Sequence, residues 1–213
     1  MAVTGPTVPD GSVADWLARC PLVAILRGVR PDEVEAIGEA LLDAGVRVLE
    51  VPLNSPDPVE SVRRLAARFG DRALVGGGTF RREAEVDAVA RAGGRLLVTP
   101  HADPALVRAA KARGMVAVPG FLTPAEAFAL LDAGADALKL FPAEAGGPAM
   151  LRALRAVLPE GVPLLPVGGV DAASIPAWRA AGAAGYGCGS ALYRPGDTPG
   201  TVAAKARALL AAL

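Results

Sequence analysis

The chain has 213 residues, of which 52% are hydrophobic, enough for one domain with a large core or at most two small ones. Its 22 basic and 22 acidic residues are mixed along the chain and cancel, which argues against nucleic acid or a membrane surface as a partner. Cys20 and Cys188 are too few and too far apart for a disulfide framework or a cysteine metal site.

The first 20 residues differ from the rest of the chain. They lack the basic and apolar regions of a signal peptide, and no later stretch reaches the ~20 apolar residues that span a bilayer. A soluble, cytoplasmic protein is expected. Within this segment "DGSVADWLARC" predicts an extra helix.

Eight apolar runs follow, alternating with helical patterns. They cover residues 22–26, 46–51, 73–78, 95–99, 115–119, 137–141, 163–167 and 185–189. Glycines recur every 20 to 27 residues and predict the ends of helices: Gly45, Gly70, Gly93, Gly114, Gly134, Gly161 and Gly182. Asp57, Asp103 and Thr123 each precede a proline and predict helix starts. The period corresponds to one strand plus one helix.

Near-continuous apolar strands alternating with helices indicate a parallel sheet covered by helices. Eight such units predict a closed (βα)8 TIM barrel with an extra N-terminal helix across its bottom. We expect one domain over 1–213, with 1–20 as the extension and helix and 21–213 as the barrel. The alternative, an open doubly wound sheet, should carry a glycine fingerprint after the first strand, which "LRGVRPDE" does not supply.

Lys139, in "DALKLFPAEAG", places an ammonium group inside an apolar strand. Burial disfavours the charged amine and lowers its pKa from ~10.4, which makes a neutral nucleophile. Alternation along the strand puts Lys139 and Phe141 on one face. In a barrel, active-site residues stand at the carboxyl ends of the strands.

Glu50 is a second lone charge in an apolar strand, on the same face as Asn54. It either neutralises a buried cation or acts as a general acid or base with a raised pKa. Two isolated ionisable groups on strands of one barrel favour the catalytic role.

The remaining candidates follow other strands. Arg27 suits a carboxylate or phosphate, or else pairs with a loop acid, and Thr79 is a small donor in a glycine-rich turn. Exposed backbone N–H groups after the last two strands predict a phosphate site at Gly168, Gly169, Gly189 and Ser190. His101 either orders its loop or acts as an acid. With one histidine and no ligand cluster, neither a metal nor another cofactor is expected.

A desolvated lysine, a carboxylate and a phosphate site together fit Schiff-base chemistry on a phosphorylated keto compound. Two other functions use the same residues. Lys139 and Glu50 could transfer protons in an isomerase or epimerase, or form a structural ion pair in a barrel that only binds phosphorylated metabolites.

The motifs "EVPLNSP", "GGGTF", "VTP", "LKLFPAEAGGP", "PVGGV" and "GCGSALYRPG" resemble those of the 2-keto-3-deoxy-6-phosphogluconate (KDPG) and 6-phosphogalactonate (KDPGal) aldolase family, in order from about Pro21 to Gly196. The resemblance implies a class I aldolase, usually a homotrimer, that splits its sugar-acid substrate into pyruvate and glyceraldehyde 3-phosphate. Lys139 would form the Schiff base and Glu50 would transfer protons.

The same resemblance assigns the other site residues. It places Arg27, Asn54, Thr79, Pro100, Phe141 and Val167 around the substrate, and Gly168, Gly169, Gly189 and Ser190 around the phosphate. The phosphogluconate branch usually carries arginine at the position of Asn54 and threonine at that of Val167. The sequence therefore looks closer to the phosphogalactonate branch, although His101 departs from the residues usual at its position.

Overall fold

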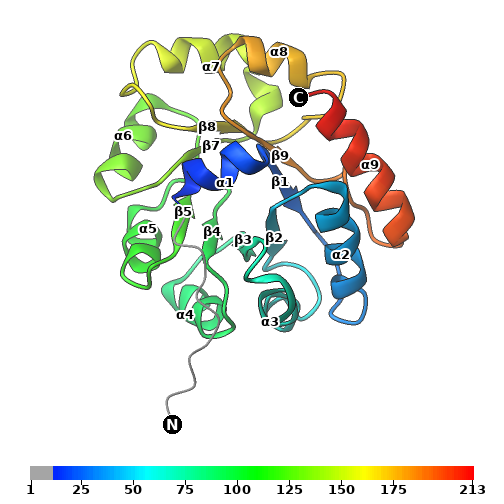
Figure 1. The fold of residues 1–213 in the computed structure, drawn as a ribbon. Coiled ribbons are helices and arrows are strands. Elements are labelled where there is room, and N and C mark those ends of the chain that lie inside the picture. Colours follow the sequence, from blue (N-terminus) through cyan, green and yellow to red (C-terminus); the bar gives the residue numbers. More distant parts are fainter. Residues whose placement is uncertain (1–11) are drawn as a thin grey trace.

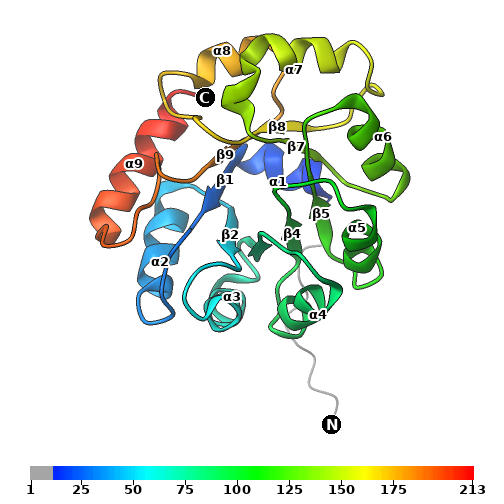
Figure 2. The same cartoon turned by 180° about the vertical axis from the view of Figure 1, so that it is seen from behind.

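The computed structural model describes residues 12–213, in which short parallel strands alternate with helices that surround them (Figures 1 and 2). The strands are β1 (Leu22–Ile25), β2 (Val48–Pro52), β3 (Leu74–Gly78), β4 (Leu96–Val98), β5 (Val116–Val118), β6 (Gly120–Phe121), β7 (Leu138–Leu140), β8 (Leu164–Pro166) and β9 (Tyr186–Cys188). The helices are α1 (Val13–Arg19), α2 (Val34–Ala44), α3 (Pro58–Phe69), α4 (Glu83–Arg91), α5 (Pro104–Lys111), α6 (Pro124–Asp132), α7 (Gly147–Arg155), α8 (Ile175–Ala180) and α9 (Pro199–Ala211).

The expected closed eight-stranded barrel is wrong. Six strands form a parallel half-barrel in the order β5-β4-β3-β2-β1-β9, and a separate sheet contains β6-β7-β8. One isolated bridge, between Val167 and Gly187, joins the two sheets. Pro119 separates β5 from β6, and Pro166 ends β8. Because proline has no N–H to donate, each of these prolines leaves one hydrogen bond out of the ladder, although the carbonyl of Pro119 still accepts from the N–H of Lys139 at 2.9 Å. The result is an α/β barrel-like fold.

The positions of the elements agree with the sequence pattern. Each predicted strand lies within two residues of an observed one, with β6 as an addition. Asp103 and Thr123 accept hydrogen bonds from the first turns of α5 and α6 as expected. Asp57 stands at the N-cap of α3, as expected, but its backbone is left-handed with φ 39° and its side chain makes no capping hydrogen bond. Gly70 also differs from the other helix-ending glycines, since its φ of −62° is right-handed.

The predicted N-terminal helix is α1, and residues 1–11 of the expected extension lie outside the described part. Ser12 caps it in a box with Asp15. Its buried face packs on inward side chains of the strands. That cluster contains Val13, Trp16 and Leu17 with Val23, Val48, Leu74, Leu96, Val98, Val118, Ala137 and Leu165. Figure 1 shows α1 lying across the strands, so the helix closes one end of the interior.

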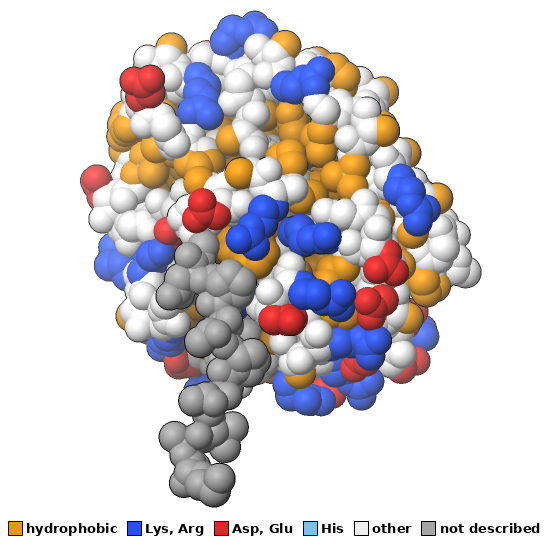
Figure 3. All heavy atoms as spheres, in the orientation of Figure 1, with side chains coloured by type: hydrophobic (Ala, Val, Ile, Leu, Met, Phe, Trp, Pro, Cys, Tyr) orange, Lys and Arg blue, Asp and Glu red, His pale blue; other side chains and the backbone are white. Residues whose placement is uncertain are grey.

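The outer surface has mixed charge. On the face seen in Figure 3, basic and acidic side chains lie interspersed over the lower half. Within residues 12–213, no helix has both the length and the apolar character needed to cross a membrane.

We expect α1 to contribute strongly to stability through Trp16, which is only 1% exposed. Trp16→Ala removes a large buried ring from a closed apolar cluster and should lower the free energy of unfolding by about 3–5 kcal/mol. Urea denaturation followed by circular dichroism measures this. Val157→Ala, at a residue that is 55% exposed, is the control and should cost less than ~0.5 kcal/mol. Equal losses in the two variants would contradict the closing role of α1.

Candidate active site

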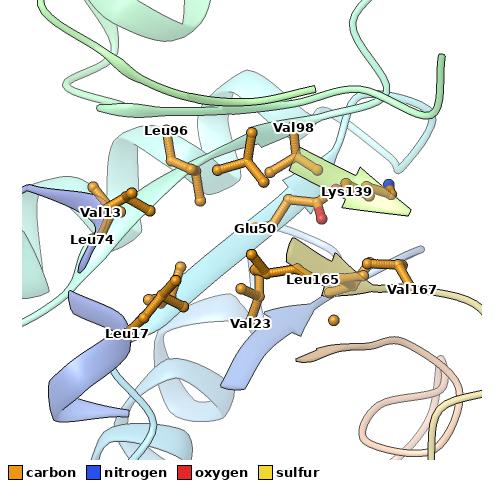
Figure 4. Close-up of a pocket in the computed structure, with 14 residues that line it drawn as sticks. Val13, Leu17, Val23, Glu50, Leu74, Leu96, Val98, Lys139, Leu165 and Val167 are labelled. Atoms are coloured by element: carbon orange, nitrogen blue, oxygen red, sulfur yellow. The ribbon is translucent and has the colours of Figure 1, made fainter. Parts of the chain in front are cut away.

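The inward side chains enclose a cavity of about 20 Å³ above α1, room for roughly one water molecule. Glu50 and Lys139 are its ionisable members (Figure 4). The remaining wall is apolar or glycine and is formed by Val13, Leu17, Val23, Ile25, Val48, Leu74, Leu96, Val98, Val118, Leu165, Val167 and Gly187. Strand alternation therefore placed both groups on the correct face, and their surroundings are almost free of other polar side chains.

Glu50 lies on β2 and is 1% exposed. Its Oε2 is buried and has no hydrogen-bond partner within the described residues. A side chain at Gly78 of β3 would collide with Oε1, so the carboxylate occupies the space that a Cβ would need there. Burial raises the pKa of Glu50, while the positive charges of Lys139 and then Arg27 oppose that rise.

Lys139 lies on β7, between β6 and β8, and is 6% exposed. Its Nζ is 4.8 Å from the centre of the Phe141 ring. Burial lowers the pKa of the amine, Glu50 opposes this shift, and the positive charge of Arg27 adds to it. A buried pair that is fully satisfied would indicate a structural role. Here the carboxylate retains an unpaired oxygen, which fits a group that exchanges protons.

A second, wider pocket of about 480 Å³ opens beside this cavity. The two share Ile25, Val167 and Gly187 in their walls. The wider pocket brings together seven of the predicted site residues, which are Arg27, Phe141, Val167, Gly168, Gly169, Gly189 and Ser190. The predicted phosphate residues thus share one pocket, and its wall continues into that of the cavity of Lys139 and Glu50.

Arg27 contacts a predicted site residue rather than a loop acid. Its Nη1 donates to Oδ1 of Asn54 at 2.6 Å. The neighbouring N–H of Gly28 donates to Oγ of Ser55 at 2.9 Å. These two bonds tie the loop after β1 to the loop after β2, so Asn54 orients the guanidinium at the pocket rim.

Thr79 and Pro100 follow β3 and β4 and line neither of these two spaces. Thr79 has a left-handed backbone with φ 64°, which a threonine adopts only where its surroundings impose it. His101 is exposed, and its carbonyl accepts a hydrogen bond of 2.6 Å from the Thr99 hydroxyl. That contact uses the backbone of His101 to order the loop, without its imidazole.

The pocket also contains residues that sequence reasoning missed, chiefly Asp171 and Arg194. Arg194 stands within "GCGSALYRPG", but no strand periodicity extends that far along the loop. Within the described chain, no group of three or more His, Cys, Asp or Glu side chains is placed to hold a metal ion.

Comparison with known proteins gives consistent similarities. Residues 13–198 match the family model for KDPG and KHG aldolases. The chain is 45% identical to the 2-dehydro-3-deoxy-6-phosphogalactonate aldolase of Escherichia coli, covering 92% of this chain and 96% of that protein. It is 31% identical to the KHG/KDPG aldolase of the same organism, with 76% of each chain covered. A solved structure described as native KDPGal superimposes with a TM-score of 0.90 and 45% identity, covering 91% of this chain and 94% of the other.

Glu50 and Lys139 each oppose the effect of burial on the other's pKa. Lys139→Met removes the positive charge with the larger effect on the pKa of Glu50, so that pKa should rise further. Arg27→Gln removes the positive charge with the smaller effect and should raise the pKa of Glu50 less. Carbon-13 NMR titration of the Glu50 carboxyl in each folded variant measures both shifts. A Glu50 pKa that is unchanged in Lys139→Met would show that the two groups do not interact.

Proposed function

Because the chain belongs to the KDPG and KHG aldolase family, we propose that it cleaves 2-dehydro-3-deoxy-6-phosphogalactonate into pyruvate and D-glyceraldehyde 3-phosphate. Family membership makes it an aldolase, and so a lyase. The observation that carries the specific proposal is the buried pair of Lys139 and Glu50 in an apolar cavity whose wall is shared with the wider, arginine-lined pocket.

In the proposed first stage, the neutral amine of Lys139 attacks the C2 ketone of the substrate. The resulting carbinolamine loses water and becomes an iminium joined to Nζ. Glu50 supplies the proton that leaves with the hydroxyl. Burial supports both roles, because it favours the neutral amine of Lys139 and the protonated acid of Glu50.

In the second stage, the carboxylate of Glu50 takes the proton from the C4 hydroxyl. The C3–C4 bond breaks, its electron pair moves toward the iminium nitrogen, and glyceraldehyde 3-phosphate leaves. The enamine that remains takes a proton at C3, and water releases pyruvate and restores the amine. A carboxylate whose pKa is raised toward neutrality suits both directions of proton transfer.

The preference for the galactonate epimer rests on two positions. The epimers differ in configuration at C4, the carbon that becomes the aldehyde. Val167 is 7% exposed and borders both spaces, so it offers an apolar surface where a threonine would offer a hydroxyl. Asn54 meets Arg27 at the rim. The protein that is 45% identical is named for the phosphogalactonate, in agreement with these side chains.

We also propose a cytoplasmic homotrimer, on the strength of the family resemblance. Cys20 and Cys188 are both buried free thiols, which suits a reducing compartment. Light scattering coupled to size exclusion should give three times the 21.5 kDa of one chain.

The covalent step gives the most direct test. Borohydride added with pyruvate should reduce the iminium and fix a three-carbon adduct on Lys139, identified by mass spectrometry of peptides. Lys139→Met removes the amine but keeps an unbranched side chain, so it should fold and lose at least ~10³-fold in turnover. Lys111→Met, on the outer face of α5, is the matched control and should retain both adduct and activity. Cleavage of the substrate by a folded Lys139→Met variant would contradict the assignment of Lys139 as the nucleophile.

Substrate preference is tested separately by comparing kcat/KM for the two epimers. We expect the wild type to favour the phosphogalactonate. Val167→Thr should move the ratio toward the phosphogluconate by about tenfold, the effect of one hydrogen bond, and Asn54→Arg should move it in the same direction.

Val170→Thr is the matched control for this comparison. Val170 lines the same wide pocket but not the cavity of Lys139, so its substitution should leave the epimer ratio unchanged. A wild-type preference for the phosphogluconate would overturn the assignment while leaving the aldolase chemistry intact.

A further inference from the structure

The wide pocket holds a second arginine, Arg194, in the loop between β9 and α9. Its Nε donates to the carbonyl of Ser190 at 3.1 Å, so the guanidinium lies over the predicted phosphate residues. Gly168, Gly169 and Ser190 line the same pocket. The remaining guanidinium N–H groups are thus available to a ligand beside these backbone amides.

The backbone on each side of Arg194 is anchored. Tyr193 is 2% exposed, and its hydroxyl donates to Oε1 of Glu33 at 3.0 Å. Pro195 packs on Gly28, where an added Cβ would stand 2.8 Å from the proline Cγ. The N–H of Arg194 itself donates to Oδ2 of Asp197 at 2.8 Å. The Arg194 side chain itself is exposed at the pocket. Because the backbone around Arg194 is already anchored, binding of a ligand would not have to order that backbone.

The acids near Arg194 are already engaged. Asp197 accepts a hydrogen bond of 2.6 Å from Nζ of Lys205. Asp171, the one acid in the pocket wall, accepts from the N–H of Ser174 at 2.8 Å. Arg27 and Arg194 against Asp171 give the ionisable residues that line the pocket one net positive charge, which favours an anionic ligand, although the carboxylate of Glu144 also lies against Gly169.

The two arginines stand in different surroundings. Arg27 follows β1, whose Ile25 lines both the wide pocket and the cavity of Lys139, and its Nη1 donates to Oδ1 of Asn54 at 2.6 Å. Arg194 stands at the glycine-rich rim. A keto acid bonded to Lys139 holds its carboxylate next to the reacting carbon, whereas its phosphate is at the far end of the molecule.

We propose that Arg194 binds the phosphate group of the substrate as a guanidinium fork, and that Arg27 serves the carboxylate end. This assignment rests on the proposed aldolase function. It makes Arg194 a residue that determines the specificity of the aldolase for phosphorylated substrates. Each anionic end of the substrate then has its own cation.

The test compares wild type with Arg194→Gln, using as substrate the epimer that the wild type cleaves faster. Loss of a charged hydrogen-bond donor should lower kcat/KM about 10- to 100-fold, mainly through KM. It should also weaken inhibition by inorganic phosphate. Exchange of the pyruvate methyl protons in D2O, which needs the amine but no phosphate, should stay at the wild-type rate. Arg194→Lys, which keeps the charge without the fork, should lose less than Arg194→Gln.

Arg207→Gln, on the exposed side of α9, makes the same change in charge away from the pocket and should alter none of these quantities. Two results would overturn the assignment: unchanged phosphate inhibition in Arg194→Gln, or equal losses in cleavage and in pyruvate exchange. Failure of the aldolase function itself has a different signature, because the wild type would then show no pyruvate exchange and no borohydride adduct.

Discussion

The desolvation of Lys139 and Glu50 is the constraint on which the rest of the structure depends. Two opposite charges in an apolar interior are costly unless their surroundings exclude water and compensate them electrostatically. Helix α1 closes the cavity from one side through Val13 and Leu17, with Trp16 buried in the same cluster. Gly78 leaves the space that the carboxylate occupies. The packing of α1 and the glycine at position 78 therefore affect the pKa values of Lys139 and Glu50. Opening the interior to water would return both pKa values toward their ordinary values.

Much of the fold could be predicted because its signals are local. Apolar runs and helix caps gave the strand positions, and strand alternation placed Lys139 and Glu50 on the inner face. Closure of the barrel could not be predicted in this way. It depends on whether N–H groups of distant strands find partners, and Pro119 and Pro166 interrupt that ladder. The prolines are plain in the sequence, but their strand partners are set only by the assembled sheet.

In the candidate site too, local features could be predicted, whereas contacts between loops could not. Glycines after the last two strands indicated a phosphate site, since exposed amides there are a local feature. The partner of Arg27 and the position of Arg194 were not accessible to this reasoning. Both depend on contacts between loops, such as Tyr193 with Glu33 and Pro195 with Gly28. No strand or helix period specifies such contacts, which form only when the elements that carry them are assembled.

The interior and the rim of the site differ in how readily they tolerate substitution. The interior groups that would carry the reaction are held by strands and by the packing of α1, where substitutions disturb the core. The groups that would recognise the ends of the substrate stand on loops at the rim, where Arg27, Asn54 and Arg194 are exposed. Substitution at the rim can therefore alter which sugar acid is bound while leaving the coupling of Lys139 and Glu50 largely intact. Val167 is the exception, since it borders both spaces, so a substitution there would change the proposed recognition at C4 and the surroundings of Lys139 together.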